Sequence, residues 1–259
     1  MTDRSYLDQT GNLVITTARP RRIISLVPSQ TGLLSDLGLD EEIVGITKFC
    51  IHPRAWLSPK KIIGGTKQYN FDVIHALEPD LIIGNKEENY EEGIVRLRTK
   101  YPVWLSDIVS LEDALAMIIS LGEITMRKSQ AEGIIDAIHI AFSALPEFDH
   151  HSVLYLIWRK PWMAAGKKTF IHTMLERTGL RNAIDDERYP ELLPEQISAL
   201  HPDYIFLSSE PYPFEEKHKE ELMNLCPAAK IILVDGEMFS WYGSRLIKAP
   251  AYFRSLNLR

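Results

Sequence analysis

The sequence has few cysteines, no excess of positive charge and no long apolar run. Only Cys50 and Cys226 occur in 259 residues, so neither a disulfide framework nor a zinc site of the C-x-x-C type is expected. Lys and Arg number 29 against 35 Asp and Glu, a net charge of −6, which argues against a nucleic-acid-binding protein that relies on bulk electrostatics. No run reaches the roughly 18 apolar residues that a membrane-spanning helix needs.

Common catalytic and metal-binding motifs are missing as well. The chain contains no G-x-S-x-G motif, no P-loop and no G-x-G-x-x-G motif, and its eight histidines show neither H-x-x-x-H nor H-E-x-x-H spacing. We therefore expect no resident cofactor and no protein-bound metal site. His52 and Tyr69 are the two side chains that remain candidates for direct ligation of an iron centre.

The first 20 residues lack the apolar core of a secretory signal peptide, because Asp3, Arg4, Asp8 and Arg19 interrupt them. We expect either a cytosolic protein or one whose export signal or lipid anchor has been removed. With 45% apolar and 25% charged residues, the composition is typical of a globular protein with one large core or two of medium size.

Two segments that lie 123 positions apart have nearly the same pattern. Residues 72–83 read DVIHALEPDLII, and residues 195–206 read EQISALHPDYIF. In each segment an acid opens a short helix and a Pro-Asp pair ends it, since proline does not continue a helix. An apolar run without alternation follows, which is typical of a parallel strand covered on both faces. Two copies in one chain predict two similar lobes.

Asp72 and Glu195 open the two copies. A carboxylate at a helix start interacts favourably with the free N–H groups of the first turn, so capping is the simplest interpretation of both acids.

The order of predicted elements gives each lobe an α/β pattern. In residues 1–108 we expect strands near 12–16, 22–26, 43–47, 61–63, 81–84 and 103–105, and helices near 30–39 and 88–100 besides the first copy. In residues 147–259 we expect strands at 153–157 and 231–234 and helices at 169–178, 215–225 and 244–256 besides the second copy.

The segment between the lobes, residues 109–146, has a different pattern. Residues 110–145 contain no proline, and apolar side chains recur at helical spacing from Leu111 to Leu145. This pattern predicts one linker helix of about 35 residues, roughly 50 Å long at 1.5 Å per residue. Gly122 and Gly133 leave open a bend or a break into two helices.

These segments together resemble a known family. Residues 22–34 (RIISLVPSQTGLL), 44–47 (VGIT), 70–82 (NFDVIHALEPDLI), 165–167 (AGK) and 194–196 (PEQ) are similar, in order and spacing, to the helical-backbone (class III) substrate-binding proteins of ABC importers. These proteins are receptors for vitamin B12, ferric siderophores and haem, and the chain most resembles the cobalamin-binding branch.

The resemblance implies two Rossmann-like α/β sandwich lobes joined by one long backbone helix, with a ligand cleft between the lobes. It also implies a monomer that works in the periplasm or on an extracytoplasmic membrane anchor. In the family, an acid on each lobe docks into arginine pockets of the permease, and here Asp72 and Glu195 hold those positions. The first acid is usually Glu, so Asp72 reaches one methylene less far.

The resemblance and the aromatic content together give the candidate ligand-binding residues. Two segments, residues 158–163 and 238–242, read as aromatic loops at strand ends, where open α/β sheets bind ligands and where aromatic faces suit a flat macrocycle or an aromatic chelate. Packing of these side chains against the lobe surface is the alternative. The candidates are Pro28, Phe49, Tyr69, Trp158, Trp162, Met163, Tyr189, Trp241, Tyr242 and Arg245.

Nearby cations extend this set. Lys48, Lys67, Arg159 and Lys160 lie near the same loops and, with Arg245, would pair with the carboxylates of a siderophore or of haem.

The sequence thus predicts a non-enzymatic binding protein that delivers a corrinoid, a ferric siderophore or haem to an ABC permease. Two alternatives remain open. A cytosolic tetrapyrrole-handling enzyme such as a chelatase would use His52 and Glu237 as proton acceptors. A cytosolic binding or sensing module would share the fold without a permease.

Overall fold

The computed structural model describes residues 3–145 and 147–258, and the chain separates into two compact units. Unit 1 comprises Met1–Ile108, Glu112–Ile138 and Tyr242–Arg245, and unit 2 comprises Val109–Leu111, His139–Trp241 and Leu246–Arg259. The segment predicted as a linker is thus divided between the two units, and a short stretch near the C-terminus belongs to unit 1. Within the described residues, no helix is long and apolar enough to cross a membrane.

Unit 1 is built on a five-stranded parallel sheet with the strand order β5-β4-β3-β8-β9. Its central strands are buried on both faces, which explains their continuous apolar sequences. The chain enters this sheet at β3 and adds β4 and β5 on one side. It then returns to pair β8 with the other side of β3 and adds β9 beyond it, so the strand order reverses between β3 and β8. The strands are β3 (Ile23–Ser25), β4 (Ile43–Ile46), β5 (Lys61–Ile62), β8 (Leu81–Asn85) and β9 (Val103–Ser106).

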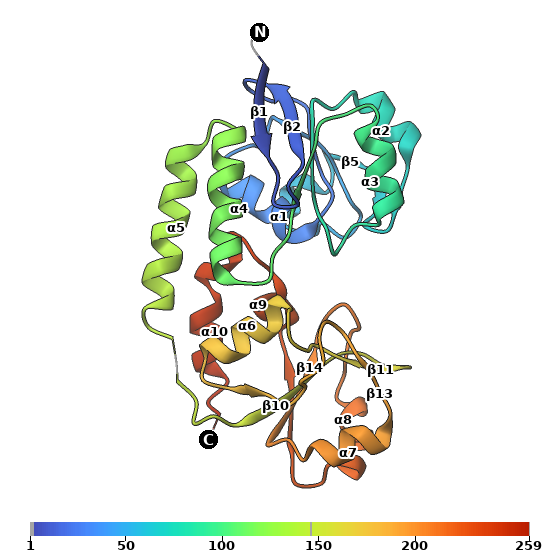
Figure 1. Ribbon diagram of the computed structural model, residues 1–259, viewed down its shortest axis with the longest axis vertical. Helices are drawn as coiled ribbons and strands as arrows, with labels where there is room; N and C mark the ends of the chain where they lie inside the picture. The colour runs from blue at the N-terminus through green and yellow to red at the C-terminus, as the bar shows by residue number, and fades with distance from the viewer. Residues whose placement is uncertain (1–2, 146, 259) are drawn as a thin grey trace. The chain divides into compact units, whose positions relative to one another are not determined.

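Besides residues 112–138, which are described below, this unit contains a 3₁₀ turn at Arg54–Trp56, three short α-helices and two small hairpins (Figure 1). The helices are α1 (Pro28–Asp36), α2 (Phe71–Leu77) and α3 (Glu91–Arg98), and the hairpin strands are β1 (Asp3–Leu7), β2 (Leu13–Thr17), β6 (Gly64–Gly65) and β7 (Gln68–Tyr69).

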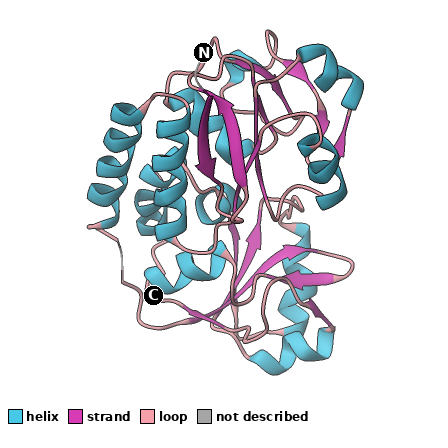
Figure 2. Ribbon diagram, turned by 45° about the horizontal axis from the view of Figure 1, so that its top comes forward, coloured by secondary structure: helices cyan, strands magenta, loops and turns pink. Residues whose placement is uncertain are grey.

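Unit 2 has a second sheet, whose strands β10, β14 and β15 are parallel while β11 and β13 extend it in antiparallel pairing (Figure 2). Its strands are β10 (Ser152–Trp158), β11 (Trp162–Ala164), β12 (Arg181–Asn182), β13 (Glu191–Leu192), β14 (Tyr204–Ser208) and β15 (Lys230–Val234). Its helices are α6 (Phe170–Arg177), α7 (Pro194–Leu200), α8 (Lys217–Leu225), α9 (Gly236–Ser240) and α10 (Ala249–Ser255). The two-lobed α/β fold predicted from the sequence is confirmed, whereas the predicted last helix begins as the 3₁₀ turn Ser244–Ile247 before α10.

The two sequence copies form the same structure. α2 and α7 each end in a residue with left-handed backbone, Glu78 and His201, both with a φ of 44°. Proline follows in each copy, and the chain then enters a buried strand, β8 or β14.

The aspartate after each proline fixes the start of the neighbouring parallel strand. The carboxylate of Asp80 accepts the backbone N–H groups of Arg21 and Arg22, at 2.7 and 2.9 Å, just before β3. The carboxylate of Asp203 accepts the backbone N–H of Ser152 at 2.7 Å and its hydroxyl at 2.8 Å, at the start of β10. The repeated Pro-Asp pair therefore ends a helix and also aligns two strands.

The single helix predicted over residues 110–145 is wrong, because the segment forms α4 (Leu111–Ile124) and α5 (Lys128–Phe142), which lie side by side in Figure 1. Met126 has a φ of 60°, and the backbone N–H of Arg127 donates to the carbonyl of Gly122 at 2.7 Å. A Cβ built on Gly122 would lie 2.4 Å from the Cβ of Ala131. The glycine therefore allows the two helices to touch where the chain reverses.

This contact gives a test of the helix pair. Gly122→Ala is expected to lower the free energy of unfolding by about 1–2 kcal/mol, because the added methyl group overlaps Ala131. Gly133→Ala in α5 is the matched control, since a Cβ there meets nothing within 4 Å and alanine favours a helix by roughly 0.5–1 kcal/mol. Urea unfolding monitored by circular dichroism measures both. Equal effects of the two substitutions would contradict the contact.

Candidate functional site

In unit 1, the predicted contacts Pro28 and Phe49 follow neighbouring parallel strands. Pro28 begins α1 directly after β3 and is half buried, and Phe49 follows β4 with 51% of its surface exposed. The Phe49 ring packs on Gly65, where a Cβ would lie 3.2 Å from the ring, and the Lys48 ammonium lies 5.1 Å from the ring centroid. Because ligands bind beyond the carboxyl ends of parallel strands, this exposed ring is well placed to contact one.

Tyr69, a predicted ligand contact, is instead part of the core of unit 1. Only 6% of it is exposed, and its ring centroid lies 4.9 Å from that of Tyr90 and 6.1 Å from that of Phe71. Burial raises the pKa of the Tyr69 hydroxyl.

Tyr242 and Arg245 belong to unit 1 although they are distant from it in sequence. Tyr242 is 6% exposed, and its hydroxyl donates to the carboxylate of Glu88 at 2.5 Å. Burial and the negative charge of Glu88 both raise the pKa of this hydroxyl. Tyr242 therefore anchors its segment to the turn after β8 and offers little surface to a ligand. Arg245 is half buried in the 3₁₀ turn that follows.

In unit 2, the segment from Trp158 to Met163, predicted as a loop, is the turn and edge of a hairpin between β10 and β11. Trp158 is 37% exposed at the end of β10, and its ring meets that of Tyr212 edge to face at 5.5 Å. Trp162 is 6% exposed and stacks parallel to Phe214 within the core. The two tryptophans thus differ, because alternate positions of a hairpin face opposite sides of a sheet.

Two further ligand contacts predicted in unit 2 lie in or beside the two outermost strands on one side of the sheet, β11 and β13. Met163 of β11 is half buried and pairs in register with Glu191 of β13. Tyr189 is half buried just before that strand, with the Arg188 guanidinium 5.7 Å from its ring. Both side chains keep part of their surface accessible.

The second predicted aromatic loop, residues 238–242, lies mostly in helix α9, so the loop prediction is wrong there. Trp241 is 8% exposed, and its indole N–H donates to Glu210 Oε1 at 2.8 Å. The Ser240 hydroxyl donates to the same oxygen at 2.8 Å. Glu210 and Glu88, which hold the polar atoms of Trp241 and Tyr242, were not identified from the sequence, because no local pattern marks contacts between distant residues.

The predicted cations differ in how their charge is used. Arg159 forms an ion pair with Glu221, with nitrogen to oxygen distances of 2.5 and 2.9 Å, and Lys67 donates to the backbone carbonyl of Glu87 at 2.7 Å. The Lys48 ammonium has no hydrogen-bond acceptor among the described residues. Lys48 is therefore the cation beside Phe49 whose charge is free to meet an anionic ligand.

The two acids of the repeat are exposed and do not cap their helices. In α2 the side chain of Asn70 accepts the backbone N–H of Val73, and in α7 the side chain of Gln196 accepts the backbone N–H of Leu193 at 2.7 Å. Asp72 and Glu195 have no hydrogen bond or ion pair with any residue that the structure describes. Neither acid forms a capping hydrogen bond, because neighbouring amides perform that role, but both lie in the first turn, where a negative charge interacts favourably with the helix dipole.

Metal-binding geometry is not found in the described part of the chain, where no three His, Cys, Asp or Glu side chains are grouped as a metal ion requires. The proton acceptors suggested for an enzyme, His52 and Glu237, belong to different units.

Comparison with known proteins identifies a matching family model and curated relatives. A model described as periplasmic binding protein matches residues 23–229. An uncharacterized ABC transporter substrate-binding lipoprotein, YvrC of Bacillus subtilis (strain 168), is 23% identical over 258 residues, which cover 93% of this chain and 82% of the relative. The vitamin B12-binding protein of Pectobacterium carotovorum subsp. carotovorum (strain PC1) is 24% identical over 253 residues, which cover 93% of this chain and 90% of the relative.

Solved structures share the fold. The ABC-type Fe3+-hydroxamate transport system protein from Saccharomonospora viridis DSM 43017 superimposes with a TM-score of 0.80 at 18% identity, with 99% of each chain covered. At this identity the similarity establishes the architecture alone.

Proposed function

Because the chain belongs to the periplasmic binding protein family, we propose that it is the substrate-binding protein of an ABC importer, which captures a metal chelate and delivers it to a permease. The observation that carries this proposal is the family match, which runs from β3 of unit 1 to the residue before β15 of unit 2. The relatives support it, since one is a substrate-binding lipoprotein and another binds vitamin B12. Such a protein is not an enzyme and acts as a monomer outside the cytoplasm, in the periplasm or on a membrane anchor.

We propose a corrinoid, a ferric siderophore or haem as the ligand. Phe49 and Trp158 are the predicted aromatics with substantial exposed surface, one in each unit, and each follows or ends a strand at its carboxyl end. Aromatic faces of this kind give a flat ligand a large contact area at low entropic cost. Pro28, Met163 and Tyr189 contribute their accessible edges, and Lys48 supplies a positive charge.

We further propose that Asp72 and Glu195 dock the protein on the permease. Both carboxylates occupy the same position of a structural repeat, both are exposed, and neither is used within the described part of the chain. A pair of matched, unneutralised charges on two units suits a partner that presents basic side chains at two places.

Titration of the purified protein tests the ligand class. Cyanocobalamin, haemin and a panel of ferric siderophores are added separately, and binding is followed by absorbance and calorimetry. At least one of them is expected to bind with a Kd below about 10 μM, a free energy near −7 kcal/mol. Failure of the whole panel at that limit would refute the proposed ligand class, and turnover of metal and porphyrin would favour the enzyme alternative.

A further inference from the structure

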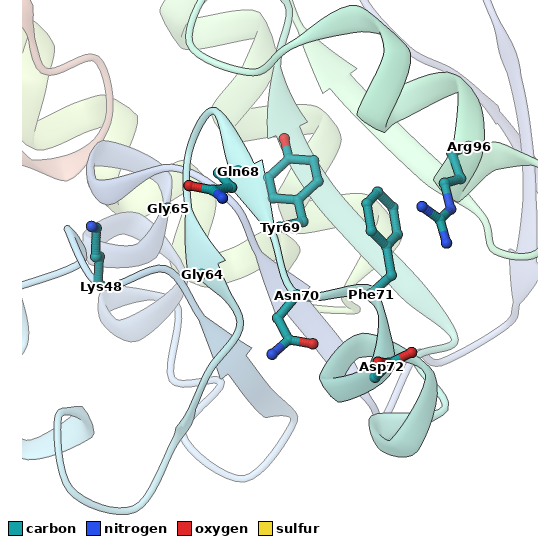
Figure 3. A pocket seen from close by; sticks show the side chains of 9 residues that line it. All are labelled: Lys48, Gly64, Gly65, Gln68, Tyr69, Asn70, Phe71, Asp72 and Arg96. Atoms are coloured by element: carbon teal, nitrogen blue, oxygen red, sulfur yellow. The ribbon is translucent and has the colours of Figure 1, made fainter.

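A pocket of about 540 Å³ lies on unit 1 beside Asp72, and it shares Lys48 with the ligand contacts proposed above. Its wall is formed by the β6–β7 hairpin and the start of α2 (Figure 3). Lys48 lies at one end of this wall and Arg96 at the other, with Gln68 and Asn70 between them.

Arg96 is held in position without neutralisation of its charge. Its guanidinium carbon lies 3.8 Å from the centroid of the Phe71 ring, which supports the flat face of the group. No carboxylate within the described residues lies near enough to pair with it. By contrast, Arg98 on the same helix pairs with Asp8 at 2.7 Å. A stacked guanidinium keeps its N–H edges free, and those edges match a carboxylate in bidentate geometry.

The remaining polar groups of the pocket leave it positively charged. Lys48 has no acceptor among the described residues, and the amide of Asn70 uses its oxygen to cap α2. Asp72 is the one carboxylate among the residues described as lining this pocket, against the two cations Lys48 and Arg96. The pocket therefore attracts an anionic group next to the carboxylate that we propose as the docking residue.

We propose that this pocket receives an acidic side chain of the permease, bound by Arg96, while a basic side chain of the same permease pairs with Asp72. This inference rests on the proposed function and specifies the chemistry of the partner. The lining side chains Lys48, Arg96 and Asp72 are exposed, so a small anion would be screened by water, whereas a protein that covers the pocket excludes that water. The ion pair between Arg96 and an acidic side chain of the permease would add binding energy next to Asp72, whose short side chain reaches less far toward the partner.

The second copy lacks this feature. Its following helix, α8, carries Lys219, whose ammonium pairs with Glu216 at 2.9 Å. That charge is already paired within unit 2, in contrast to Arg96 of unit 1.

The test measures binding of the full chain to the permease of the source organism in lipid nanodiscs, by surface plasmon resonance. Arg96→Gln is expected to raise the Kd by about tenfold. The Kd of Arg96→Lys should lie between those of Arg96→Gln and the unchanged protein, because lysine keeps the positive charge but lacks the two parallel N–H donors of the guanidinium. Lys100→Gln is the matched control, because it removes one exposed positive charge nearby, outside the pocket, and should leave the Kd unchanged. Thermal unfolding checks that all variants fold.

A double-mutant cycle identifies the partner group. The acidic residues of the permease surface are replaced one at a time. One of these replacements is expected to raise the Kd of the unchanged protein but to leave the Kd of Arg96→Gln unaltered. An unchanged Kd for Arg96→Gln, or an equal loss for Lys100→Gln, would overturn the inference while leaving the docking role of Asp72 intact. If the unchanged protein fails to bind the permease at all, the proposed function itself fails, and this inference fails with it.

Discussion

Replacement of Asp72 and Glu195 together by lysine is expected to abolish association with the permease, with a Kd at least about 100-fold higher, and to leave ligand affinity unchanged. The reason is that both side chains are exposed and neither forms a hydrogen bond or ion pair with a described residue, so the fold loses only the favourable first-turn charge. Lysine at these positions would meet the basic side chains of the partner with like charge. Surface plasmon resonance against the permease measures the first effect, and ligand titration measures the second.

The control for this reversal is Glu92→Lys combined with Glu220→Lys. These acids are also exposed, lie one in each unit and stand in the first turn of α3 and α8, so the change in net charge is the same. Permease binding should survive in this control. If both double variants lose binding equally, overall charge and not the repeated positions determines docking, and if Asp72→Lys lowers ligand affinity, that residue acts in ligand binding.

The two-lobed fold was predictable because its signals are local. Each copy of the repeat places a helix, a Pro-Asp stop and an apolar strand within about a dozen residues, and hydrogen bonds of Asp80 and Asp203 explain why the acid follows the proline. The apolar strands without alternation correctly indicated parallel sheets covered on both faces.

The break between α4 and α5 was not predictable from helical periodicity. Apolar spacing continues through the turn, because both helices pack an apolar face and the chain reverses without a proline. The close approach of Gly122 and Ala131 accommodates the reversal, and this contact between helices forms only once the turn exists. A glycine in a helix marks a possible break, and its environment determines whether the chain turns.

The sequence indicates less about the burial of the candidate ligand-binding residues than about the fold. Aromatic residues near strand ends were correctly located, but the sequence does not distinguish an exposed ring such as Phe49 from a buried one such as Tyr242. The difference comes from hydrogen-bond partners far along the chain: Glu88 lies 154 residues from Tyr242, and Glu210 lies 31 residues from Trp241. Such pairings depend on tertiary structure and leave no periodic signal.

Asp203→Ala is expected to lower the free energy of unfolding by about 2 kcal/mol, and combination with Asp80→Ala by about 4 kcal/mol. Each substitution removes two hydrogen bonds to a charged acceptor, and the first leaves the N–H of Ser152, a buried residue, unsatisfied. Chemical unfolding of the variants and of the unchanged protein measures the differences. Asp185→Ala is the control, since that exposed acid forms only a surface ion pair with Lys167 and its loss should leave stability unchanged.

The pH dependence of stability shows whether the loss in Asp203→Ala comes from the carboxylate charge of Asp203 or from packing of an uncharged side chain. Hydrogen bonds from the backbone N–H and the hydroxyl of Ser152 lower the pKa of Asp203 below its usual value. A carboxyl group with a lowered pKa stabilises the fold fully above the pKa of the unfolded chain, about 3.9, and loses this contribution as the pH falls through the folded-state pKa. The stability difference between the unchanged protein and Asp203→Ala should therefore still be present at about pH 5 and shrink below about pH 4. A difference that persists undiminished at pH 2 would show that the loss comes from packing, and that the carboxylate charge does not hold β10 in place.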